Sequence, residues 1–159
     1  MKTLIMGIGN NLLGDDGAGL MLARQLYALI GSDDMDFIES SHAGSRCIDF
    51  LSGYDRVIII EVFYDKDKPV GECYRIVLPE VIPLELLSSH HADFFRSLEV
   101  ARQSGMVSLK KISIYAITAK EIFEFSQGLS QEMKERIPGI MEEIVRDEFM
   151  DDQEKMRYA

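Results

Sequence analysis

The chain has 159 residues, a formal net charge of −10, 47% hydrophobic residues and 28% charged residues. This length fits one globular domain, which we place at residues 1–150 and follow with a polar C-terminal tail at 151–159. The basic residues are scattered and form no patch, so nucleic acid and anionic membranes are poor partners.

Two features of the sequence bear on its location. The chain begins with a strand-like segment rather than a signal peptide, and no apolar stretch approaches the ~18 residues that a membrane span needs. Cys47 and Cys73 lack the spacing of a metal site and are expected to be buried thiols in a reducing compartment. We therefore expect a soluble, cytoplasmic protein.

Strand-like and helix-like segments alternate along the chain, which predicts a three-layer α/β fold. Its mainly parallel, twisted sheet would have about five strands, with helices on both faces. The apolar pattern predicts strands at 3–8, 35–39, 56–63, 72–78 and 111–117, the fourth alternating like an edge strand. It predicts helices at 17–30, 44–53, 90–104 and 131–146, with Gly31 ending the first and Pro138 kinking or breaking the last.

The segment GIGNNLLGDDGAG at 7–19 carries the strongest functional signal. It joins the first strand to the first helix, which is where open α/β sheets usually place ligands. Its glycines allow a tight turn, and the adjacent carboxylates of Asp15 and Asp16 stand at the start of the helix. Their negative charge favours a cation over a phosphate as the ligand.

Two further positions could join this loop. Glu61 interrupts the apolar run of the third strand near its carboxyl end, where burial of an unpaired carboxylate would be costly. His90 and His91 stand at a helix start, and His42 follows the second strand. Because the carboxyl ends of parallel strands share one rim, Asp16, Glu61 and a histidine could converge there. Two carboxylates and an imidazole suit a divalent transition metal that keeps positions open for a substrate.

Each of these residues also has an ordinary structural interpretation. Asp15 is the better candidate for the N-cap of the first helix, a role worth about 1 kcal/mol, which leaves Asp16 for function. Glu61 could lie half solvated at the strand exit or pair with a lysine, and His42 could be a hydrogen-bonded loop histidine. The glycines around Asp16 would leave room for an approaching chain: Gly14, Gly17 and Gly19.

Other motifs for catalysis or nucleotide binding are missing from the sequence. It has no P-loop GK[ST], no G-x-S-x-G elbow and no H-E-x-x-H helix. A dinucleotide fingerprint is met only in part, because Leu12 occupies the place of the third glycine, although Glu39 stands near the place of the ribose-binding acid. Asp15 and Asp16 would repel a pyrophosphate, so a nucleotide binder is the weaker alternative.

These residues resemble the [NiFe]-hydrogenase maturation endopeptidases over nearly the whole chain, to about Ile144. The family's opening loop, G-x-G-N-x-x-x-x-D-[DE]-x-x-G, corresponds to 7–19 here. Its acid at the end of the third strand falls on Glu61, and its S-x-H segment, which opens a helix, falls on 88–90. The sequences AIT at 116–118 and GLS at 128–130 resemble the family's closing strand and a later helix start.

The resemblance implies that Asp16, Glu61 and His90 are both the metal ligands and the catalytic residues. It implies an endopeptidase that removes the C-terminal extension of the [NiFe]-hydrogenase large-subunit precursor after nickel insertion. The nickel would arrive with the precursor rather than stay bound to the enzyme. There it would mark the substrate and polarise the scissile carbonyl or a water molecule.

The chain departs from the family's pattern at three places. Glu61 replaces the usual aspartate and is longer by one methylene, ESSHAG at 39–44 stands where the family tends to show D-x-G-T-x-G, and Ala119 replaces a usual proline. A non-catalytic maturation chaperone that binds the metal or the precursor on the same fold is therefore the alternative function. Glu61 is its best support.

Overall fold

The computed structural model describes residues 1–42, 44–78, 89–107, 111–120 and 125–150, with the backbone alone at 78, 89–93 and 95. Its five-stranded sheet has the order β2-β1-β3-β5-β4. The strands β1 (Thr3–Ile8), β2 (Met35–Ser40), β3 (Arg56–Tyr64) and β5 (Lys111–Ala119) are parallel, and β4 (Cys73–Leu78) is antiparallel to β5 at one edge. The predicted mainly parallel sheet, with its edge strand, is confirmed.

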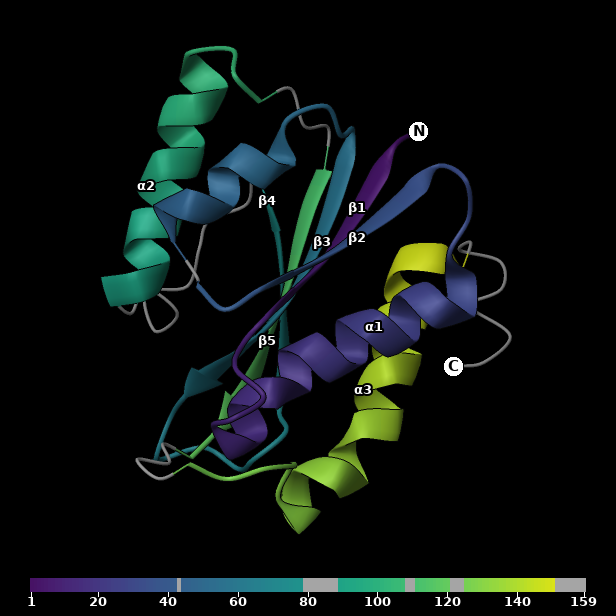
Figure 1. The fold of residues 1–159 in the computed structure, drawn as a ribbon, viewed down its shortest axis with the longest axis vertical. Coiled ribbons are helices and arrows are strands. Elements are labelled where there is room, and N and C mark those ends of the chain that lie inside the picture. Colours follow the sequence, from purple (N-terminus) through teal and green to yellow (C-terminus); the bar gives the residue numbers. More distant parts are fainter. Residues whose placement is uncertain (43, 79–88, 108–110, 121–124, 151–159) are drawn as a thin grey trace.

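Helices cover both faces of this sheet, as predicted (Figure 1). On one face lie α1 (Ala18–Ile30) and α3 (Gln131–Phe149), and on the other lie α2 (Ser89–Gln103) and the 3₁₀ helix η2 (Ser45–Leu51). A one-turn 3₁₀ helix, η1 (Gly14–Gly17), leads into α1. The tail predicted at 151–159 lies outside the described residues. None of the described helices is both long and apolar enough to cross a membrane.

The expected break at Pro138 does not occur, because α3 runs through this residue from Gln131 to Phe149. Pro138 is exposed, so its ring lies on the solvent side of the helix. Ile137 and Ile140, which flank it, are buried against the sheet and hold both halves of the helix in place. Tertiary packing therefore outweighs the hydrogen bond that proline removes.

Alternation along β3 divides the core into two apolar layers. Ile58 and Ile60 pack in the layer beneath α1 and α3, whereas Val57 and Ile59 pack in the layer beneath η2 and α2. The same alternation assigns Glu61 to the η2 and α2 side of the sheet.

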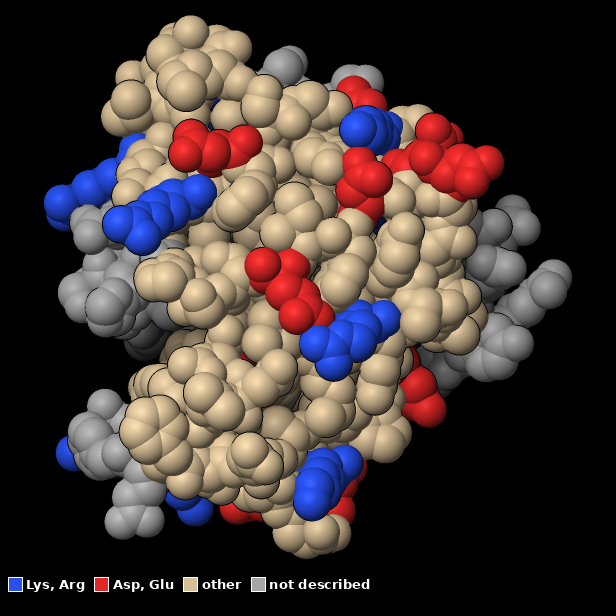
Figure 2. Space-filling model, in the orientation of Figure 1, with Lys and Arg blue, Asp and Glu red and all other residues tan. Residues whose placement is uncertain are grey.

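The side of the molecule on which α1, α3, α2 and η2 are all in view mixes charges of both signs. Figure 2 shows acidic and basic side chains interspersed between broad areas of other residues on this face. The view shows no continuous basic surface of the kind that binds nucleic acid.

A buried carboxylate ties the end of α3 to the sheet. Glu148 is only 8% exposed and accepts hydrogen bonds from Arg75 (2.8 Å), Lys111 (2.9 Å) and the hydroxyl of Tyr115 (2.9 Å). It also pairs with Arg56 at the start of β3. Because Arg56 and Lys111 begin neighbouring strands, this cluster fixes α3 against the amino ends of β3 and β5.

Replacing this carboxylate should destabilise the fold strongly. We expect Glu148→Gln to lower the free energy of unfolding by about 3 kcal/mol, because three buried or half-buried cations lose their shared anion. Urea unfolding measures the effect. Glu142→Gln, at an exposed position on the same helix, is the matched control and should change stability by less than about 0.5 kcal/mol. Equal stability of the two variants would show that the cluster contributes nothing.

The same cluster should make the fold sensitive to acid. Burial raises the pKa of Glu148, but hydrogen bonds from Lys111, Arg56 and Arg75 outweigh it and lower the pKa from 4.5 to about 2. The carboxylate therefore stabilises the fold fully above pH 4.5, and this contribution is lost as the pH falls towards about 2. Urea unfolding between these pH values should show a steeper loss of stability for the wild type than for Glu148→Gln. Parallel pH profiles would contradict this assignment.

Candidate active site

The glycine loop after β1 lies directly on the carboxyl ends of β1 and β3. A Cβ atom at Gly9 would stand 1.9 Å from the carbonyl oxygen of Asp16. One at Gly19 would stand 2.5 Å from the carbonyl oxygen of Ile8 and 3.1 Å from the Cα of Glu61. Gly9 and Gly19 thus let the chain's own backbone pack closely. At Gly17 a Cβ atom would stand 3.0 Å from Oδ1 of Asn11, so neither Gly17 nor Gly19 leaves the predicted room for an approaching chain.

Asp15 does not cap the first helix, contrary to the prediction. The N-cap of α1 is Gly17, which makes no side-chain cap. Asp15 is 3% exposed and instead accepts two hydrogen bonds from Ser130, one from the backbone N–H (2.7 Å) and one from Oγ (2.8 Å). Ser130 is the N-cap of α3, and its Oγ accepts from the N–H of Met133 (3.1 Å). Asp15 therefore joins η1 to the start of α3 and has a structural role.

Asp16, the next residue, lies at the rim of the sheet. Its Oδ1 accepts a hydrogen bond of 3.0 Å from the hydroxyl of Tyr64, the last residue of β3. Burial raises the pKa of Asp16, and hydrogen bonds from Tyr64 and the Asn10 backbone partly oppose this rise. The negative charge of Glu61 raises the pKa of Asp16 further. Asp16 and Glu61 are therefore close enough to repel each other, which the rim hypothesis requires.

Glu61 is 6% exposed on β3, and its charge acts on the other side of the sheet as well. Burial raises the pKa of the Cys47 thiol, and the Glu61 charge raises it further. The Sγ of Cys47 lies 2.9 Å from the carbonyl oxygen of His42. The exposed ring of His42 has its Nδ1 2.8 Å from the Oγ of Ser41, so His42 fits the ordinary interpretation of a hydrogen-bonded loop histidine.

The third predicted ligand belongs to α2. His90 lies in the first turn of this helix, and its side chain and that of His91 lie outside the described residues. Within the part of the chain that the structure describes, no three His, Cys, Asp or Glu side chains form a group that could hold a metal. Asp16 and Glu61 are two carboxylates near the carboxyl ends of β1 and β3, and oxygen donors of this kind are ligands that divalent cations accept.

The structure also places residues at this rim that the sequence analysis did not single out. The backbone N–H of Ser126 donates to the carbonyl of Leu12 (3.0 Å), and that of Gly14 donates to the carbonyl of Ser126 (2.8 Å). This pairing sets the exposed side chains of Leu12 (50%) and Phe125 (84%) beside the loop that carries Asp16. Tyr64 could have been found as the last residue of its strand, but Phe125 gave no signal in the sequence.

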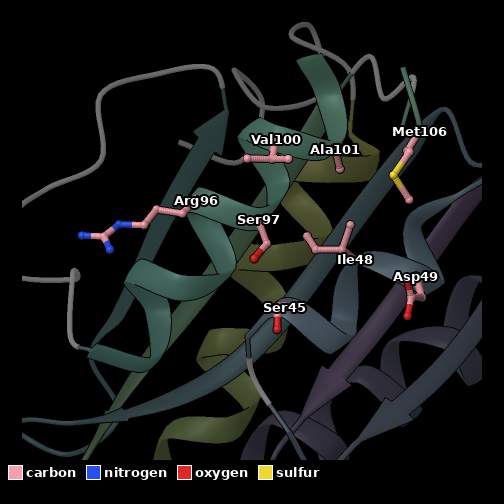
Figure 3. Close-up of a pocket in the computed structure, with 8 residues that line it drawn as sticks. All are labelled: Ser45, Ile48, Asp49, Arg96, Ser97, Val100, Ala101 and Met106. Atoms are coloured by element: carbon pink, nitrogen blue, oxygen red, sulfur yellow. The ribbon is translucent and has the colours of Figure 1, made fainter. Parts of the chain in front are cut away.

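Two other places are less suited to the chemistry. Glu39 is the acid that the nucleotide-binding alternative requires. It forms an ion pair with Arg24, in which Nη2 of Arg24 lies 2.6 Å from Oε1 of Glu39. A hollow of about 320 Å³ lies between η2 and α2, with Asp49 and Arg96 on opposite sides of it (Figure 3). Neither Asp16 nor Glu61 lines this hollow.

Comparison with known proteins decides the family. The HycI family model, described as a hydrogenase maturation protease, matches residues 21–147. The chain belongs to this family of hydrogenase maturation proteases. The family and its peptidase class, both expected from the sequence, are confirmed. The matched residues include Glu61 and His90 and begin after Asp16, and the match assigns no role to any residue, so the ligand roles of Asp16, Glu61 and His90 stay predictions.

Solved structures show the same fold. The hydrogenase maturating endopeptidase HybD from E. coli is 21% identical, with a TM-score of 0.71 over 94% of both chains. HybD from Thermococcus kodakarensis, a [NiFe] hydrogenase maturation protease, is 26% identical, with a TM-score of 0.70 over 92% of this chain and 98% of that chain.

One curated relative is longer than this chain. It is the hydrogenase expression/formation protein HupD from Thiocapsa roseopersicina, which is 23% identical over 145 residues. The alignment covers 89% of this chain and 65% of HupD, so the chain spans a little under two thirds of that relative.

The two adjacent aspartates should respond oppositely to removal of their charge. We expect Asp15→Asn to lower the free energy of unfolding by about 1.5–3 kcal/mol, because two hydrogen bonds to a charged acceptor are weakened in a buried place. Asp16→Asn should leave stability unchanged or raise it, because it removes a charge that burial and Glu61 both disfavour. Urea unfolding at neutral pH compares the variants, and equal losses for both would contradict the division of roles.

Proposed function

We propose that this protein is an endopeptidase that removes the C-terminal extension of the [NiFe]-hydrogenase large-subunit precursor after nickel insertion. The observation that supports the proposal is the packing of the glycine loop of Asp16 against the strand end that carries Glu61, in a chain of this family. Nickel enters as part of the precursor, and His90, at the start of α2, is proposed as the third ligand.

Electrostatics supports a cation as the ligand of this rim. The charge of Glu61 raises the pKa of Asp16, so the pair is held together at a cost that a bound divalent cation would offset. A precursor that carries nickel would bind through this contact, and a precursor without nickel would lose it. The metal would thus serve as the mark of a substrate that is ready for cleavage.

The reaction itself is the hydrolysis of one peptide bond. Water adds to the scissile carbonyl, the C–N bond breaks, and the proton passes to the leaving amine while a new carboxyl group forms. Water is the better attacking group than the nearby thiol, because burial raises the pKa of Cys47 and leaves little thiolate. The nickel of the substrate supplies Lewis acidity, which contributes several kcal/mol to such hydrolyses.

The surroundings of the carboxylates suit a polypeptide substrate. Leu12 and Phe125 expose large apolar side chains next to the loop of Asp16, and a chain that crosses the rim would cover them. We also propose a cytoplasmic location, in keeping with two cysteines that form no disulfide.

A cleavage assay tests the proposal. The purified protein is incubated with nickel-loaded and nickel-free large-subunit precursor, and mass spectrometry follows loss of the C-terminal peptide. We expect cleavage of the loaded form alone. Asp16→Asn and Glu61→Gln should each reduce the rate at least about 100-fold, because each removes a charged contact to the substrate's metal. Glu142→Gln, remote on α3, should cleave like the wild type.

The outcomes separate the two candidate functions. Cleavage that ignores nickel, or that survives both carboxylate variants, would overturn the metal-dependent mechanism. Stable binding of the loaded precursor without cleavage would instead establish the maturation chaperone, the function that Glu61 in place of aspartate favours. In that case Glu61→Asp tests whether the shorter carboxylate restores cleavage.

A further inference from the structure

One hydrogen bond links the loop carboxylate to the sheet. The hydroxyl of Tyr64 donates to Oδ1 of Asp16 over 3.0 Å, and the side chain of Tyr64 is near the surface, with 42% of the residue exposed. Tyr64 stands three residues after Glu61 on the same strand, so by alternation the two side chains lie on opposite faces. The face of Tyr64 is that of α1, where η1 carries Asp16.

The two partners belong to different elements of the fold. Asp16 belongs to η1, a single 3₁₀ turn without a side-chain cap. Tyr64 still pairs with Ala119 in the sheet, and the next N–H, of Asp65, donates to the carbonyl of Ala119 (3.1 Å). The hydrogen bond therefore links the Asp16 side chain directly to the end of a central strand.

Both carboxylates then depend on β3. Glu61 is placed by the strand directly, and Asp16 is placed by the strand through Tyr64. Tyr64 donates to Oδ1, which fixes the orientation of the carboxylate and with it the position of the other oxygen, Oδ2. This oxygen lies on the side of Gly9, where no side chain is present.

We propose that Tyr64 is a positioning residue of the active site, which fixes the Asp16 carboxylate so that it offers one defined oxygen to a divalent cation. The proposal rests on the proposed function, since it assumes that Asp16 contacts the metal of the substrate. Partners that orient a metal ligand typically change metal affinity 10–100-fold when they are removed.

The test uses Cd²⁺ alone, titrated calorimetrically into the full chain, and compares four proteins. They are the wild type, Tyr64→Phe, Asp16→Asn and the matched control Tyr54→Phe. Tyr54 also donates to an aspartate, Asp36 (2.7 Å), but just before β3 begins, at the opposite end of the sheet. We expect Tyr64→Phe to weaken Cd²⁺ binding at least about 10-fold and Tyr54→Phe to leave it unchanged.

A second readout separates positioning from mere folding. The visible absorption spectrum of bound Co²⁺ should differ between Tyr64→Phe and the wild type, because a freed Oδ1 alters the coordination of the ion. Urea unfolding shows whether the fold itself has changed.

The results distinguish the proposal from the function on which it rests. Binding that falls in Asp16→Asn but is unchanged in Tyr64→Phe, with an identical Co²⁺ spectrum, overturns the role of Tyr64 and leaves the proposed function standing. A wild type that binds neither ion overturns both the role of Tyr64 and the metal contact of Asp16. Tighter binding by Tyr64→Phe would show that the hydroxyl competes with the metal, which also overturns positioning.

Discussion

The close packing of the glycine loop against the ends of β1 and β3 is the constraint on which the site depends. The backbone at Gly9 touches the carbonyl of Asp16, and Gly19 fits between the carbonyl of Ile8 and the Cα of Glu61. Neither position has space for a Cβ atom, so larger residues there would lift the loop off the sheet. Only this contact brings the loop acid within the electrostatic reach of the strand acid.

The pKa of a buried or half-buried acidic group is shifted in opposite directions at the two ends of the sheet. At the amino ends, Glu148 is surrounded by Arg56, Arg75 and Lys111, which lower its pKa and make its charge a source of stability. At the carboxyl ends, burial and a like charge raise the pKa of Asp16. The first arrangement stabilises the charged carboxylate, whereas the second disfavours the charged form of Asp16.

The two adjacent aspartates of this loop have different partners. The carboxylate of Asp15 accepts from Ser130 and fixes the start of α3, so it is occupied. Asp16 points to the rim, where its one described side-chain partner is the hydroxyl of Tyr64. The two solved HybD structures share the layered fold of this chain at 21–26% identity, so the layered fold tolerates wide changes in sequence. The apolar surface of Leu12 and Phe125 is built by backbone pairing between two loops.

The sequence by itself determined the alternating elements, the mainly parallel sheet and the rim at which its candidate site residues lie, because these follow from local apolar periodicity and from the positions of the glycines. It also singled out Asp16 and Glu61, since an acid beside glycines and an acid in a β-branched run both conflict with simple packing. Only the tertiary structure decided that Asp15 binds the N-cap residue of a distant helix, that α3 continues through Pro138, and that Tyr64 donates a hydrogen bond to Asp16. Each of these three features depends on residues that are far apart in the chain or on packing against the sheet. Local apolar periodicity does not reveal such contacts.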